Sequence, residues 1–224
     1  MRRLLTVPAL MLGLMMVGCG EDAAKDVPKA TAEAARPVPS DAPKAADAST
    51  KGAAPATSNA LAIAPTTSKI EFIGSNKIGA SHNGGFKTFD GIVAMHDGKP
   101  EVKSIAVDID TKSLYSDDEK LTGHLKSKDF FEVETHPTAK FVTTEIKPGG
   151  EKGATHTLVG NLTLHGVTKS ITIPATVKVE GDTMTLKSEF ALNKNDFGMT
   201  FGGPGNVIRE EVVIKLDVKA AKKG

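Results

Sequence analysis

The chain has few of the residues on which many functions depend. Its 224 residues include one Cys, one Tyr and no Trp. A single Cys cannot form an internal disulfide, and the scarcity of aromatic side chains argues against a surface that stacks bases or sugars. The 28 basic and 27 acidic residues give a net charge of +1, so no nucleic-acid-binding surface is indicated.

Signatures of catalysis and of metal binding are also missing. The sequence has no Gly-x-Ser-x-Gly elbow, no phosphate-binding glycine loop and no second Cys. Asp129 and Asp196 each precede a Phe, and we interpret them as caps of backbone donors. We therefore predict no enzyme activity and no cofactor. No metal site is predicted either, because no ligand-pair spacing on a strand or helix is found among His82, His96, His124, His136, His156 and His165.

The N-terminus resembles a bacterial lipoprotein leader. Arg2 and Arg3 precede a short apolar run, and small residues lead to Cys19. We predict a signal peptide over 1–18 and acylation of Cys19, with a plain secretory signal as the alternative. Several acyl chains on one residue would anchor the chain to a membrane. Gly20, rather than Asp, follows the Cys, which favours the outer membrane of a bacterial cell envelope, on its periplasmic side.

The composition divides the rest of the chain. Residues 19–60 are rich in Ala, Pro, Lys and Thr and contain no aromatic residue, whereas all nine Phe lie at Phe72 or beyond. A stretch so poor in large apolar groups predicts a disordered tether after the lipidated Cys. The folded domain is expected over 61–220, with a short tail at 221–224.

Eight segments of the folded domain alternate apolar and polar residues with the period of a β-strand. The segment 78–85 between the first two is rich in Gly and Asn and is predicted to be a turn. The strands are expected at about 69–74, 86–96, 104–111, 139–147, 157–164, 170–179, 183–192 and 212–218.

One segment has the spacing of a helix. Leu121 and Leu125 lie four residues apart and share one face of a short helix with His124 and Lys128, and Asp117 or Asp118 would cap this helix. The helix falls between the third and fourth strands, where it would cover an open end. The prediction is thus an all-β fold, an eight-stranded antiparallel β-barrel with one short helical insertion; a β-sandwich is the other way to close such a set.

The inward faces of these strands are mostly aliphatic. Because few of these side chains are bulky, they predict an apolar lumen able to hold a flexible chain. The same alternation also fits a barrel whose interior is fully packed. Phe130 and Phe131 would close one end. The expected lumen residues are Ile70, Phe72, Ile105, Val107, Ile109, Phe141, Leu162, Leu164, Ile171, Ile173, Leu186, Phe190, Ile214 and Leu216.

Three motifs in this order resemble the YceI family: HLKSKDFFEVETHPTAKF from His124, GNLTLHGVTK from Gly160 and NKNDFGM from Asn193. The resemblance covers about 61–220. It implies a lipocalin-like barrel, typically periplasmic or secreted, that holds a polyisoprenoid such as a quinone tail or a polyprenyl phosphate. His124 and His165 lie in these motifs; they either bond backbone groups or contact a lipid head group.

Two departures from the family pattern leave the identity of the lipid head group undetermined. The first strand, SKIEFIG, lacks the Trp that members often carry, and Leu121-Thr122-Gly123 stands where an Arg-Asp pair often precedes the His-Leu.

The leading prediction is a membrane-anchored, non-enzymatic carrier or sequestering protein for a long-chain isoprenoid lipid. The alternatives are a solid barrel whose outer face or loop 202–205 binds a partner protein, and an enzyme that would need His124 and Asp129 to converge inside the lumen. Homodimer formation is left open.

Overall fold

The computed structural model describes residues 22–40, 42, 59–202 and 207–222. Cys19, the predicted signal peptide, most of 43–60 and the glycine-rich loop at 203–206 lie outside these ranges. The elements in chain order are β1 (Thr31–Ala34), β2 (Ala60–Ile63), β3 (Lys69–Ser75), β4 (Ser81–Phe86), β5 (Phe89–Met95), β6 (Val102–Asp110), η1 (Thr111–Ser113), β7 (Leu114–Ser116), α1 (Glu119–Lys126), β8 (Thr138–Pro148), η2 (Glu151–Gly153), β9 (His156–Leu164), β10 (Val167–Glu180), β11 (Thr183–Asn193), η3 (Lys194–Phe197) and β12 (Glu211–Ala221).

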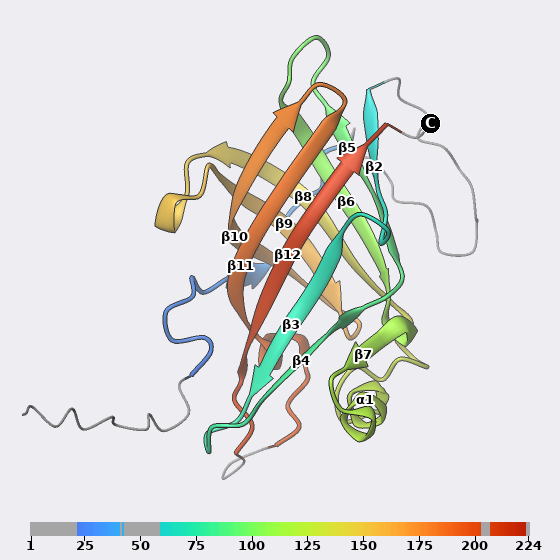
Figure 1. Cartoon of the computed structure of the whole chain (residues 1–224), viewed down its shortest axis with the longest axis vertical. Coiled ribbons are helices and arrows are strands. Elements are labelled where there is room, and N and C mark those ends of the chain that lie inside the picture. Colours follow the sequence, from blue (N-terminus) through green and yellow to red (C-terminus); the bar gives the residue numbers. More distant parts are fainter. Residues whose placement is uncertain (1–21, 41, 43–58, 203–206, 223–224) are drawn as a thin grey trace, which may run out of the picture.

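Eight antiparallel strands close a barrel in the order β2, β5, β6, β8, β9, β10, β11, β12 and back to β2 (Figure 1). Closure leaves no unpaired edge in the ring, and the alternating apolar residues face its interior. The predicted eight-stranded antiparallel barrel is confirmed.

The first predicted strand differs in detail. Residues 69–75 form β3, which pairs with the N-terminal part of β12. The short β2 pairs with the last residues of β12. The two strands therefore share one side of β12.

The prediction of a turn over 78–85 is wrong for most of that segment, because Ser81–Phe86 forms β4 between β3 and β7. Gly84 and Gly85 are required there by close packing rather than by a turn. A Cβ on Gly84 would lie 2.3 Å from Cζ of Phe72, and one on Gly85 would lie 2.7 Å from the Ile70 carbonyl oxygen. Only glycine lets β4 approach these groups.

The N-terminal segment also departs from the prediction of a disordered tether over 19–60. Residues 22–40 run along the outside of the barrel, and β1 pairs with β10 (Figure 1). Ala24 is buried against Ala191 and Val213, with Val27 packed beside them. Small apolar residues are thus sufficient to order this segment, because the barrel supplies the surface they pack against and the segment need not form a core of its own.

The helical insertion is confirmed as α1, at the lower end of the barrel in Figure 1. Asp118 is its N-cap, since its Oδ1 accepts a hydrogen bond from the Leu121 amide at 2.7 Å. No helix within the described ranges is long and apolar enough to cross a membrane.

Candidate functional site

An apolar cavity of about 320 Å³ occupies the interior of the barrel. Its wall includes the fourteen side chains expected to face inward from the strand alternation, from Ile70 on β3 to Leu216 on β12. It also includes Phe130 and Phe131, which makes sixteen. The volume lies at the lower end of the range for pockets that enclose drug-sized ligands. The geometry suits a narrow apolar group.

Some inward side chains keep part of their surface accessible. Val107, Phe141 and Leu162 line the cavity and pack against the core, yet they are only partly buried. In a filled barrel, inward residues in mid-strand would be fully buried. Their exposure is therefore toward the lumen, which the side chains of this barrel do not fill.

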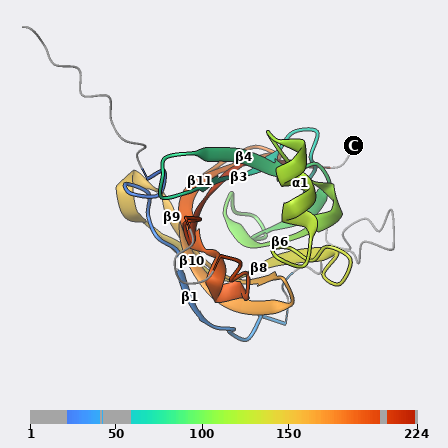
Figure 2. The ribbon, with the colours of Figure 1, turned by 90° about the horizontal axis from the view of Figure 1, so that it is seen from below.

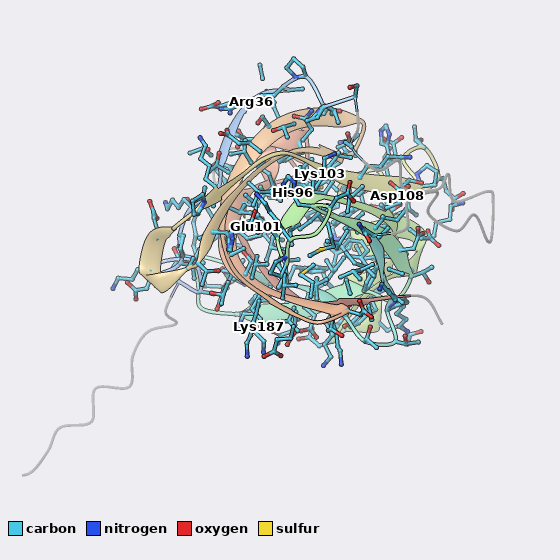
Figure 3. The ribbon with its side chains drawn as sticks, turned by 90° about the horizontal axis from the view of Figure 1, so that it is seen from above. Arg36, His96, Glu101, Lys103, Asp108 and Lys187 are labelled. Atoms are coloured by element: carbon cyan, nitrogen blue, oxygen red, sulfur yellow. The ribbon has the colours of Figure 1, made fainter. Side chains whose placement is uncertain are left out.

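The two ends of the barrel differ. At the upper end, near the turn that joins β5 to β6, Met95 and Val102 pack against the core without lining the cavity. His96 and Glu101 lie on that turn, as Figure 3 shows from above. At the lower end, the cavity wall includes the exposed residues Ala80 and His82. The cavity therefore reaches solvent at the lower end.

The polar side chains of the described cavity wall gather at this lower mouth. They are Ser75, Asn76, His82, Lys194 and Arg209. The two fully charged groups of this wall are both cations, and Asp22 pairs with one of them, Arg209. The mouth therefore suits a polar group whose oxygen atoms accept hydrogen bonds. An amphiphile with an apolar tail inside and a polar head at the mouth fits this distribution.

Lys194 is a buried cation beside the apolar wall. Its Nζ donates hydrogen bonds to the carbonyl oxygens of Met199 at 2.7 Å and Phe201 at 3.3 Å, and to Oδ1 of Asn195 at 3.0 Å. Burial lowers the pKa of the ammonium, and the charge of Glu210 opposes that shift. Lys194 thereby holds the chain that follows η3 in place at the mouth.

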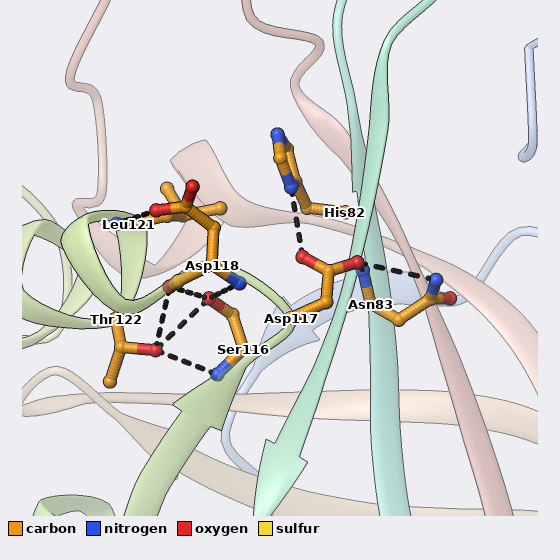
Figure 4. Close-up of polar contacts among 7 residues, drawn as sticks. All are labelled: His82, Asn83, Ser116, Asp117, Asp118, Leu121 and Thr122. Carbon is orange, nitrogen blue, oxygen red and sulfur yellow. Dashed lines mark hydrogen bonds and ion pairs between the residues drawn. The ribbon is translucent and has the colours of Figure 1, made fainter.

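The helix α1 is fixed to β4 by polar contacts (Figure 4). Asp117 accepts hydrogen bonds from the Asn83 amide at 2.7 Å and from Nδ1 of His82 at 2.8 Å. These bonds lower the pKa of the Asp117 carboxyl, the backbone amide being the larger cause. The Thr122 hydroxyl accepts a bond from the Ser116 amide at 2.9 Å. The helix is consequently held at the lower end of the barrel, where Figure 2 shows it from below.

Aromatic rings cover this end of the cavity. Phe131 packs edge-on against Phe86, with ring centroids 5.8 Å apart. Phe130 lies 5.1 Å from His124 and 5.1 Å from Phe201, centroid to centroid. The expectation that Phe130 and Phe131 cover one end agrees with these positions, since both line the cavity.

The two histidines singled out from the sequence do not line the cavity. Nε2 of His124 lies 3.0 Å from Oδ2 of Asp129, outside the lumen. His165 donates from Nδ1 to the carbonyl oxygen of Phe197 at 3.1 Å, a contact to the backbone. Asp196 is exposed on η3. These groups therefore do not converge inside the barrel.

The mouth residues were missed by sequence reasoning. Lys194 lies within the motif NKNDFGM, and Arg209 is the only Arg after Arg36 and follows two apolar residues. The available signal was their position, since each lies within three residues of the end of a predicted strand. His82 and Asn76 lay in the segment assigned to a turn or beside it.

Comparison with known proteins agrees with the motifs. A family model described as a YceI-like domain matches residues 61–220. The chain belongs to this family. A UPF0312 protein of Pseudomonas putida strain W619 is 42% identical over 143 residues, which cover 61% of this chain and 70% of that protein. A UPF0312 protein of Pseudomonas fluorescens strain SBW25 is 40% identical over 144 residues, covering 62% and 72%.

Solved structures share the barrel of this YceI-family chain. The crystal structure of BcnA from Burkholderia cenocepacia is 26% identical and superposes with a TM-score of 0.62, over 71% of this chain and 99% of BcnA. A polyisoprenoid binding domain from Saccharophagus degradans, implicated in plant cell wall breakdown, is 16% identical with a TM-score of 0.58, over 74% and 99%. At that identity the second likeness shows the fold alone.

Proposed function

We propose that the protein binds a long-chain isoprenoid lipid in its barrel lumen and carries, stores or sequesters it. The observation that carries the proposal is a lumen that is apolar along its length and polar only at an open lower mouth. An isoprenoid tail, such as that of a quinone or a polyprenyl phosphate, has the matching character. The binding of a polyisoprenoid by the Saccharophagus degradans domain supports the choice of lipid.

The role is binding rather than catalysis. Transfer of the tail from water to the lumen supplies about 25 cal/mol for each Å² of apolar surface buried. Arg209 at the mouth would contact the head group, whose oxygen atoms accept hydrogen bonds, whereas the three donors of the Lys194 ammonium already bond Met199, Phe201 and Asn195. Within the described ranges, the acid and base candidates His124 and Asp129 are bonded to each other outside the lumen.

The membrane anchor would be the acylated Cys19, on the periplasmic side of the outer membrane. Asp22 lies three residues further on, and its Oδ2 is 2.8 Å from Nη1 of Arg209 at the cavity mouth. Three residues of extended chain span about 10 Å. An acylated Cys19 would therefore hold the cavity mouth close to the lipid surface.

The rim of the mouth carries exposed apolar side chains that suit this orientation. Ile78 at the β3–β4 turn is 77% exposed, and Val207 is 44% exposed. The Lys77 amide bonds the Val207 carbonyl oxygen, which places these two segments side by side. Phe201 is 37% exposed beside α1. Apolar side chains in such a position insert into a membrane interface.

The test is uptake from vesicles. Radiolabelled polyprenyl phosphate or long-tailed quinone is offered in liposomes to the chain from Gly20 onward, and vesicles are removed by flotation. We expect the label to appear with the protein at one molecule per chain or fewer. Label that stays with the vesicles at every protein concentration would contradict the proposal.

The proposed orientation is tested separately with the acylated chain. A flexible linker of about 20 residues between Gly20 and Glu21 moves the mouth away from the anchor. We expect slower loading from the same membrane with unchanged affinity in solution. Equal loading rates would contradict the orientation and leave lipid binding intact.

A further inference from the structure

Three side chains from separate parts of the chain meet outside the cavity, at the lower end of the barrel. Glu132 and His136 lie on the connection between α1 and β8, and His165 lies on the turn between β9 and β10. Oε2 of Glu132 is 3.8 Å from Nε2 of His136 and 3.6 Å from Nε2 of His165. The two imidazole rings are 4.8 Å apart between centroids.

The hydrogen bonds of His165 decide which atom faces Glu132. Its Nδ1 must carry the proton, because the Phe197 carbonyl oxygen 3.1 Å away can only accept. In the neutral ring, Nε2 then presents a lone pair. This atom is buried and has no hydrogen-bond partner in the described part of the chain.

Two acceptors therefore face each other at 3.6 Å, a distance too long for a hydrogen bond. The other oxygen of Glu132 is occupied, since Oε1 accepts a bond from the Thr135 hydroxyl at 2.9 Å. A cation between Oε2 of Glu132 and Nε2 of His165 would satisfy both lone pairs. The bond from Nδ1 to a backbone carbonyl is the contact that commonly orients a metal-binding histidine.

The backbone holds this arrangement at a conformational cost. Glu132 and His165 have φ values of 44° and 50°, a region that non-glycine residues rarely occupy. Gly166 beside them has φ 74°, and a Cβ there would lie 2.7 Å from Cε1 of His136. Strained residues of this kind often accompany functional sites.

The distances fit a small divalent ion. Tetrahedral Zn²⁺ with bonds of about 2.0–2.2 Å separates its ligand atoms by roughly 3.3–3.6 Å. All three ligand atoms already lie within 4.8 Å of one another, so shifts of a few tenths of an ångström to about one ångström would complete the site. Two imidazole nitrogens and one carboxylate are a common zinc set, with the fourth position open to water.

We infer that Glu132, His136 and His165 bind one Zn²⁺ ion. The ion would join the connection after α1, which carries Phe130 and Phe131 over the cavity, to the β9–β10 turn. By linking these two segments, it would fix the covered side of the cavity mouth. The inference rests on these three side chains and stands whether or not the lumen binds a lipid.

The test is zinc binding by the metal-free chain from Gly20 onward, measured by titration calorimetry and by metal analysis after dialysis. We expect one equivalent of Zn²⁺ in the wild type, and affinity at least tenfold weaker in Glu132→Gln, His136→Asn and His165→Asn. His96→Asn, on the turn at the opposite end, is the matched control and should bind as the wild type does.

Thermal unfolding distinguishes loss of the ion from loss of the fold. Zn²⁺ should raise the Tm of the wild type and of His96→Asn, and at the same concentration should raise the Tm of the three ligand variants less or not at all. Circular dichroism must show the same β-sheet content in all five proteins. Absence of binding at 0.1 mM Zn²⁺, or equal binding by a well-folded Glu132→Gln, would overturn the inference.

Discussion

A larger side chain on the wall of the lumen should distinguish a barrel with an open lumen from one with a packed interior. Val107 on β6 lines the cavity, is only partly buried, and lies opposite Gly91 across the β5–β6 pair. Val107→Phe adds four carbon atoms. At about 0.8 kcal/mol per buried carbon group, complete burial would stabilise the fold by at most about 3 kcal/mol.

The expected net effect is smaller. Part of the new ring would still face open cavity, and ordering it costs about 0.5–1 kcal/mol. We therefore expect the free energy of unfolding to change by about 0 to 1 kcal/mol in the stabilising direction. In a solid barrel, the same overpacking would destabilise by roughly 1–3 kcal/mol.

Urea unfolding followed by far-ultraviolet circular dichroism gives the free energy, since the chain has no Trp for fluorescence. The same protein should take up less isoprenoid from vesicles, because the ring occupies the path of the tail. Thr185→Phe, on the outward face of β11 between Met184 and Leu186, is the control and should retain uptake. Destabilisation above about 1 kcal/mol together with unchanged uptake would refute the open lumen.

Four further substitutions test the packing of the barrel, the stability of α1 and the charge of Lys194. Gly160→Ala should lower the free energy of unfolding by roughly 1–3 kcal/mol, because the new Cβ would lie 2.5 Å from Cζ of Phe141. Gly123→Ala in α1 should raise it by about 0.5–1 kcal/mol, because the new Cβ meets nothing within 4 Å and alanine favours the helix. Urea unfolding measures both changes. Asp118→Ala removes the α1 cap and should cost about 1 kcal/mol in the same assay, with faster amide exchange confined to the helix. Burial lowers the pKa of Lys194 below 10.5, so between its folded and unfolded pKa values the unfolded chain binds more protons and the free energy of unfolding rises with pH. Lys194→Met should lack this rise in unfolding curves taken at increasing pH below 10.5, and an identical pH dependence would contradict the assignment.

Most of the barrel could be predicted from the sequence because its strands are long and half-buried. Ile105, Val107 and Ile109 alternate with polar or small residues, which fixes the face that points inward. The cap at Asp118 and the break at Pro137 likewise have local causes. These features depend on neighbouring residues and need no knowledge of distant contacts.

What could not be predicted depends on contacts between distant segments. The glycines of β4 indicate a turn by their propensity. The structure instead requires a glycine at position 84 because the ring of Phe72 on the paired strand β3 lies too close for a side chain. Ala24 has too little apolar surface to order a segment alone and is buried only because the outer face of β12 is already formed. Glu132 and His136 have i,i+4 spacing, but His165 joins them only through the barrel.

The most direct test of lipid binding is native mass spectrometry of the chain from Gly20 onward, secreted by a bacterial host and kept free of detergent. We expect a species heavier than the apoprotein by the mass of one quinone or polyprenyl lipid, and a smaller fraction of that species in Val107→Phe. A protein that shows only the apoprotein mass, before and after addition of such lipids, would contradict the account and leave the barrel without a lipid ligand.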